Sequence, residues 1–81
     1  MGRFYFHLRM DDKIITDQEG SDCIDIAAAR LEALVAARDI LADAIRSGNE
    51  DTPEAFIIAD SEGRELATVP LAVVLPRRLK Y

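Results

Sequence analysis

The chain has 81 residues, 49% of them hydrophobic and 31% charged, and its 15 acidic residues against 10 basic ones give a net charge of −5. This composition is typical of a globular domain, and the negative charge argues against non-specific binding to a phosphate backbone. The lone cysteine, Cys23, excludes an intrachain disulfide and a metal finger built on paired cysteines. We therefore expect a single domain over 1–81, with no metal and no cofactor, in the reducing cytoplasm.

No stretch reaches the roughly 18 apolar residues that a membrane-spanning helix needs, and the N-terminus lacks the apolar centre of a signal peptide. We expect no association with a membrane. At this length a domain buries only about 60 to 65% of its unfolded surface, so a second subunit would add useful stability.

The first predicted element is a strand over residues 3–9. Apolar Phe4, Phe6 and Leu8 alternate there with Arg3, Tyr5, His7 and Arg9, which is the period of a half-buried strand. Turn-forming residues follow, and then the short apolar run "KIIT". Residues 3–16 therefore predict a β-hairpin.

A long helix is predicted next, from about Asp25 to Ser47. The segment has no internal Gly or Pro, and it stops at Gly48–Asn49, residue types that tolerate a left-handed helix end. At 100° per residue, one stripe contains Ile26, Ala29, Ala33, Ala37, Ile40 and Ala44, and the charged residues Glu32, Asp39, Asp43 and Arg46 lie opposite. The alanine stripe predicts close packing of the helix on a sheet.

The remaining chain predicts a second hairpin. "EAFIIAD" and "ELATV" read as strands, with Gly63 in the turn between them at positive φ. "LAVVL" is either a strand extension or one helical turn, and residues 76–81 form a basic tail. The order ββαββ predicts an α+β, two-layer domain with a core over about 3–71: a four-stranded antiparallel sheet with one long helix on one face and the other face bare.

Three large apolar side chains, Leu31, Val35 and Ile45, fall outside the alanine stripe and widen the apolar arc of the helix. Two interpretations stay open for them. Either "LAVVL" folds back over them or they are partly exposed, or else they form a flank that packs against a second subunit. A homodimer is the partner we expect, and another protein partner is possible.

The row Arg3, Tyr5, His7 and Arg9 is the second candidate surface. Aromatic and guanidinium groups on an open sheet face are able to stack unpaired bases, with Arg77, Arg78 and Lys80 adding charge. The glycine and aromatic motifs of common RNA-binding sheets are absent, however, and the net charge opposes binding. Nucleic acid is the alternative we keep but do not expect.

No arrangement in the sequence indicates catalysis, and we expect no enzyme activity. Acidic neighbours Glu19, Asp22 and Asp25 should raise the pKa of Cys23 and reduce its reactivity. The acidic loop "DQEGSDCID" fails as a calcium loop, because Ile15 and Ile26 fall where carboxylates are required. The pair Asp11–Asp12 fits a turn.

Short motifs spread along most of the chain carry a family resemblance. They are "YFHLR" at 5–9, an acidic turn with Gly20, Ala29, Arg30, Glu32 and Ala33 of the helix, "F.I.D..G" over 56–63, and "TVP" at 68–70. In this order, from Arg3 to about Leu71, they resemble a family of small bacterial domains of unknown function that is common in alphaproteobacteria. The resemblance implies no catalytic or binding residue. The extension "LAVVLPRRLKY" is where this chain is expected to differ from that family.

Overall fold

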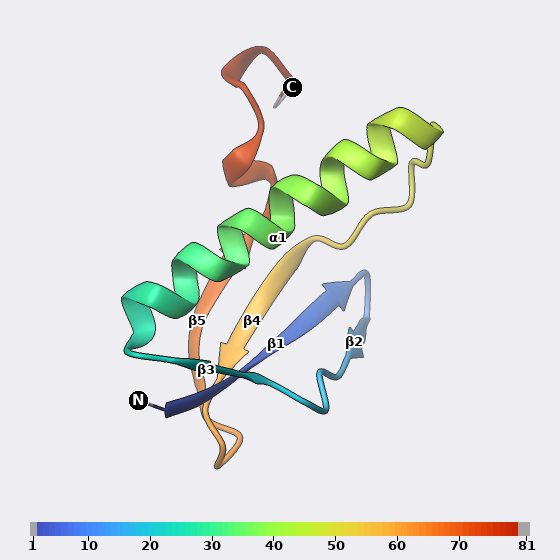
Figure 1. Cartoon of the computed structure of the whole chain (residues 1–81). Coiled ribbons are helices and arrows are strands. Elements are labelled where there is room, and N and C mark those ends of the chain that lie inside the picture. Colours follow the sequence, from blue (N-terminus) through green and yellow to red (C-terminus); the bar gives the residue numbers. More distant parts are fainter. Residues whose placement is uncertain (1, 80–81) are drawn as a thin grey trace.

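A computed structural model of the chain describes residues 2–79 (Figure 1). The elements run in the order β1 (Gly2–Met10), β2 (Lys13–Ile15), β3 (Ser21–Cys23), α1 (Ile26–Ser47), β4 (Ala55–Ala59), β5 (Glu65–Pro70) and two 3-10 turns, η1 (Leu71–Val74) and η2 (Arg77–Leu79). Helix α1 crosses one face of an antiparallel sheet in which the main strand order is β2-β1-β4-β5 (Figure 1). The predicted α+β class, single long helix and two hairpins are confirmed.

The predicted number of four strands is wrong, because residues 2–79 form a sheet of five strands. The additional strand, β3, pairs with Gly2–Phe4 at the start of β1, while β2 pairs with the end of β1 over residues 8–10. A three-residue strand of sequence "SDC" has no hydrophobic alternation to reveal it. It is held in the sheet by its long partner β1 and not by its own propensity.

Both ends of α1 are fixed by the residues that the sequence indicated. The Asp25 side chain accepts a hydrogen bond from the Ala28 N–H at 2.9 Å, which satisfies one of the free donors of the first turn. At the other end, Gly48 adopts φ 72°, and its N–H reaches the carbonyl groups of Ala44 and Ile45.

The core lies between α1 and the sheet. Ala29, Ala33 and Ala37 of the helix are almost fully buried, and their small side chains let the helix approach the strands closely. The helix-facing rows of the sheet complete this cluster with Phe4, Phe6 and Leu8 of β1, Phe56 and Ile58 of β4, and Ala67 and Val69 of β5. The predicted buried row of β1 is therefore confirmed, although these three side chains are only partly buried.

The segment "LAVVL" forms the turn η1 and does not extend β5. The Leu71 N–H donates to the Glu54 carbonyl at 2.9 Å, and the Leu71 side chain is buried in the core. The chain then turns toward α1, where Val74 packs against the core cluster. Of the basic tail, 77–79 form η2, and Lys80 lies outside the described residues.

Candidate functional site

The outer row of β1 is placed as predicted. Tyr5 and His7 pair with Ala59 and Ile57 of β4 on the sheet face away from α1. Their rings stack with centroids 6.4 Å apart and an interplanar angle of 18°. The structure thus brings the two aromatic members of the row into direct contact.

The sheet face that carries this row is less bare than predicted. Ile57, at the centre of the face, is only 5% exposed, and its neighbours Ala55 and Ala59 are 1% exposed. Ile57 lies between His7 of β1 and Thr68 of β5 in the sheet register. Side chains of the neighbouring strands β1 and β5 therefore shield β4, and this face of the sheet offers little apolar area to a partner.

The two arginines at the ends of the row are each paired with an acidic group. Arg3 donates to the Glu19 carbonyl at 2.8 Å and lies 3.5 Å from the Asp22 carboxylate. Arg9 lies 3.7 Å from the Glu54 carboxylate. These exposed pairs are weak, but they place negative charge next to each guanidinium group. The row is consequently not a concentrated positive strip.

Asp17 is the polar residue that sequence reasoning missed. It lies between β2 and β3, where the side of β1 opposite β4 has no strand beside its middle, and its carboxylate accepts the Phe6 N–H at 3.0 Å. Its own N–H donates to Nδ1 of His7 at 3.0 Å. Asp17 thus replaces the missing ladder contacts between the two short strands.

The surroundings of Asp17 favour its charged form. Partial burial alone would raise the pKa of this carboxyl, but hydrogen bonds from the N–H groups of Phe6, Gly20 and Glu19, together with the nearby His7, bring the pKa below its ordinary value. The sequence signal for this role was the spacing Asp-x-x-Gly, which is typical of an aspartate that caps its own turn.

Gly20 closes the same turn. It has φ 71°, and a Cβ atom there would lie 2.9 Å from the Phe4 carbonyl oxygen and 3.0 Å from the Tyr5 ring. The turn therefore needs glycine both for its backbone conformation and for space.

Cys23 is buried in the core cluster, which agrees with the prediction that it is unreactive. Burial is the main cause that raises the pKa of its thiol, and the negative charge of Glu32 adds to it. The acidic neighbours Asp22 and Asp25 contribute in the predicted direction, whereas the part played by burial and by Glu32 was not foreseen.

The second candidate surface is the helix flank, by which we mean Leu31, Val35 and Ile45. These side chains are 64%, 54% and 67% exposed. The segment after β5 borders Ile45, which lines a depression together with Val74, Leu75 and Pro76, but it does not bury this side chain. The interpretation in which "LAVVL" buries the flank is therefore wrong.

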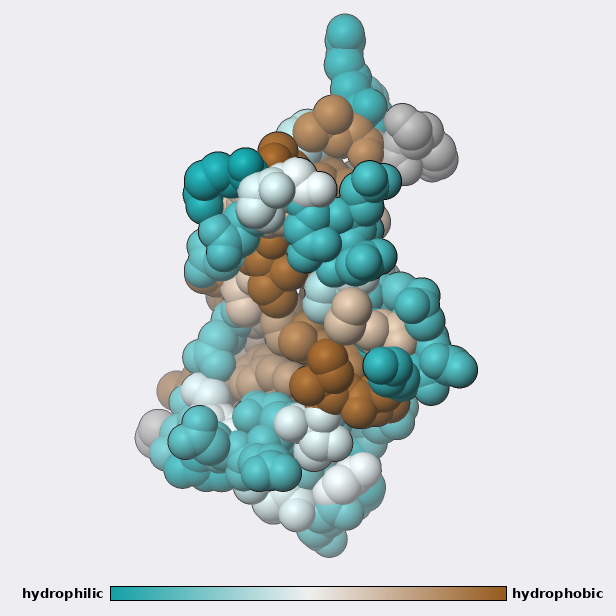
Figure 2. Space-filling model, turned by 90° about the vertical axis from the view of Figure 1, so that its right-hand side faces the viewer, coloured by the Kyte–Doolittle hydropathy of each residue, from teal (hydrophilic) through white to brown (hydrophobic). Residues whose placement is uncertain are grey.

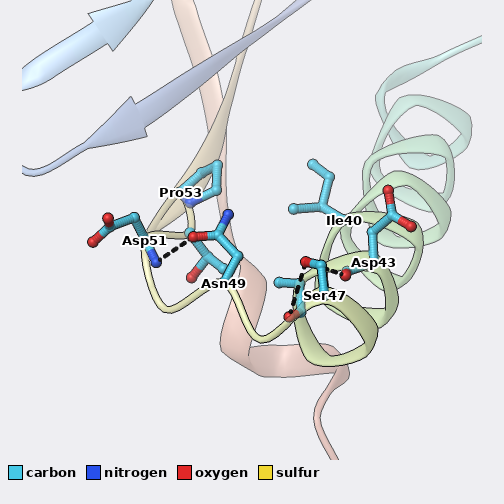
Figure 3. Close-up of a pocket in the computed structure, with 8 residues that line it drawn as sticks. Ile40, Asp43, Ser47, Asn49, Asp51 and Pro53 are labelled. Atoms are coloured by element: carbon cyan, nitrogen blue, oxygen red, sulfur yellow. Dashed lines mark hydrogen bonds between the residues drawn. The ribbon is translucent and has the colours of Figure 1, made fainter.

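Three depressions border the second half of α1, and the smallest, of about 170 Å³, includes Arg38, Ala42, Ile45 and Pro76 in its lining. The two larger ones lie at the end of the helix. One, of about 380 Å³, lies between the helix and the tail and includes Leu41, Ile45, Leu75 and Leu79 in its lining. The other, of about 260 Å³, lies between the last turns of α1 and the loop that follows (Figure 3). Two polar side chains of this second depression form hydrogen bonds within the chain, because Ser47 donates to the Asp43 carbonyl and Asn49 accepts the Asp51 N–H. Neither depression is lined by a residue of the outer row of β1.

A smaller apolar area lies at the edge of the sheet. Ile14 and Ile15 of β2 are each 50% exposed. Figure 2 shows this side of the molecule, with hydrophobic surface at mid-height, further hydrophobic surface in the upper part and hydrophilic surface below. A three-residue edge strand of this kind gives only a short template for pairing with another chain.

Comparison with known families decides the assignment. The model of a domain of unknown function, DUF6894, matches residues 3–72. The chain belongs to this family. The match ends at Ala72, so residues 73–81 lie beyond it, as the resemblance predicted for most of the C-terminal extension. No curated protein and no solved structure matches this DUF6894 chain.

Two further properties concern the described part of the chain. Across residues 2–79, no group of three or more His, Cys, Asp or Glu side chains is arranged to hold a metal ion. No helix in the same range has the length and apolar character needed to cross a membrane.

Proposed function

We propose that this DUF6894 domain is a small, non-catalytic protein–protein interaction module that forms a homodimer. The observation that carries the proposal is the exposed helix flank, in which three large apolar side chains are more than half exposed on one side of a helix. Scattered apolar residues are normal on a protein surface, whereas the three large side chains of the helix flank lie along one side of a single helix, where a second subunit would bury them together.

The total surface of the chain supports the same proposal. A compact monomer of 9.0 kDa is expected to expose about 4,900 Å². The chain exposes 5788 Å², which leaves an excess of about 900 Å². A standard protein–protein interface buries about 800 Å² on each partner. The excess surface is thus of the size that one dimer interface would bury.

The shape of the molecule explains where the excess lies. Its extents are 36 × 24 × 19 Å, and its radius of gyration is 12.8 Å, compared with about 11.7 Å for a compact chain of this length. Helix α1 has 22 residues, whereas β5, the strand that it contacts most, has six. The end of the helix and the tail therefore extend beyond the sheet (Figure 1).

Sedimentation velocity or light scattering over a range of concentrations tests the proposal. We expect a dimer mass of about twice 9.0 kDa at micromolar concentration. A strictly monomeric mass at high micromolar concentration would contradict it.

The alternative function, weak binding of single-stranded nucleic acid, is favoured by the stacked rings of Tyr5 and His7. The pairing of Arg3 and Arg9 with acidic groups weighs against it. If the alternative holds, a mixed-sequence oligonucleotide binds at low salt, and the affinity falls steeply as salt is added.

A further inference from the structure

The exposed side of α1 has a regular seven-residue pattern. The three residues of the helix flank and two residues between them form a row that we call the seam. It consists of Leu31, Val35, Arg38, Ala42 and Ile45, which are separated by four, three, four and three positions. All five are exposed. This spacing is that of the seam along which two helices pack in a coiled coil, and it spans about 21 Å of helix.

The seam is self-complementary when two copies run in opposite directions. A two-fold axis beside Arg38 places Leu31 of one copy against Ile45 of the other and Val35 against Ala42. A symmetric dimer interface requires such a match of one surface with itself. Other registers of the seam bring an apolar residue against Arg38 or leave Ile45 without a large partner.

The charges beside the seam select the same arrangement. Each of Leu31, Arg38 and Ile45 is followed by a charged residue. These charged residues form a row along one border of the seam: Glu32, Asp39 and Arg46. In antiparallel helices this charged row packs beside the same row of the second copy in reverse order, so that Glu32 faces Arg46 of the second copy. The same order brings the two Asp39 side chains together near the axis, beside the two Arg38 side chains, so that the like charges of each pair lie next to opposite charges of the other.

A parallel arrangement lacks this complementarity. It would bring the charged row of one copy against the other border of the seam in the second copy, where Leu34 and Leu41 lie. Within one chain, moreover, Glu32 and Arg46 are separated by 14 positions, or about 21 Å of helix, and cannot form a pair. Among residues 2–79, the one ion pair of Arg46 is its exposed contact with Asp43.

We infer that the homodimer forms through α1, packed antiparallel against α1 of a second copy about a two-fold axis at Arg38, with two Glu32–Arg46 ion pairs between the copies. This inference rests on the proposed homodimer and specifies its surface and geometry. It assigns the interface to the helix flank and not to the outer row of β1 or to the edge strand β2.

A charge exchange tests the inference. Glu32→Arg and Arg46→Glu each oppose like charges twice in the dimer, and we expect each to weaken dimerisation by about tenfold. The double variant restores the pairs with reversed sign and should return the dissociation constant to within about threefold of that of the original chain. Glu65→Arg, at an exposed residue of β5 distant from the seam, is the control with the same change in charge.

Cysteine cross-linking tests the direction of packing. In a Cys23→Ala background, Leu31→Cys and Ile45→Cys should not form a disulfide-linked dimer when each variant is oxidised alone, but a mixture of the two should. Cross-linking of each variant with itself would show a parallel dimer and overturn the inference.

The outcomes separate the two proposals. A chain that stays monomeric at high micromolar concentration contradicts both the proposed function and the interface. A dimer whose affinity is unchanged in Glu32→Arg and Arg46→Glu, or whose copies cross-link through Ile14→Cys of β2, keeps the homodimer and overturns the helix interface. Circular dichroism of each variant verifies that α1 is intact.

Discussion

The backbone N–H of Asp17 donates to Nδ1 of His7 over 3.0 Å, and this contact joins the loop between β2 and β3 to the middle of β1. Since the Asp17 carboxylate also accepts the adjacent Phe6 N–H, one residue contacts two neighbouring residues of β1 on the side where neither β2 nor β3 pairs with them. The edge of the sheet depends on this residue.

Asp17→Ala should destabilise the domain by about 1–3 kcal/mol, because it leaves a part-buried Phe6 N–H without its charged acceptor. Chemical denaturation at pH 7 measures the change. Asp17→Asn keeps one side-chain oxygen as an acceptor and should lose less. An Asp17→Ala variant as stable as the original chain would contradict the role given to this carboxylate.

The same carboxylate should make stability depend on pH. Because the pKa of Asp17 is lower in the folded state than in the unfolded state, its contribution is fully present above the unfolded pKa. The contribution decreases as the pH falls through the folded pKa. We therefore expect the denaturation midpoint to fall in the acid range, and the fall should be smaller in Asp17→Asn, which does not titrate.

Gly20→Ala should be strongly destabilising, by about 2–4 kcal/mol, because a methyl group adds a clash with the Phe4 carbonyl to the cost of positive φ. Gly63→Ala is the matched control. Gly63 has φ 83°, but no atom lies within 4 Å of its would-be Cβ, so only the backbone term of about 1 kcal/mol applies. Equal losses in the two variants would exclude the steric contribution at Gly20.

Cys23 should react slowly with a thiol reagent in the folded protein. Burial, followed by the charge of Glu32, raises the pKa of its thiol, so that little thiolate forms near neutral pH and access is blocked. We expect the rate of reaction with Ellman's reagent at pH 8 to increase at least about tenfold when denaturant unfolds the chain. Fast modification of the folded chain would place the thiol outside the core.

Features that depend on residues close in sequence were predicted well. The alternation in β1, the Asp25 and Gly48 ends of α1 and the alanine stripe that packs on the sheet all follow from local pattern and backbone preference. The residues of the two candidate surfaces were likewise found from their position on a strand or helix. The contacts that these residues make in the folded chain were not predicted.

Features that depend on distant contacts were missed. β3 is too short to show a pattern and forms because β1 is long enough to pair with two strands at different points. Asp17 lies in a loop by composition, and only the folded chain brings it to Phe6 and His7. Likewise, the shielding of Ile57 depends on side chains from β1 and β5 that meet only in the sheet.

The alanines of α1 give the last prediction, which concerns the distance between helix and sheet. Ala33 is 1% exposed at the centre of the helix face that packs on the sheet. Ala33→Leu adds three heavy atoms where the core has no space, so we expect a loss of about 1–3 kcal/mol in the free energy of unfolding. Ala27→Leu is the control, because Ala27 is exposed on the same helix and the change there should stay within about 0.5 kcal/mol. If both substitutions are neutral, α1 is not held as close to the strands as its alanine stripe implies.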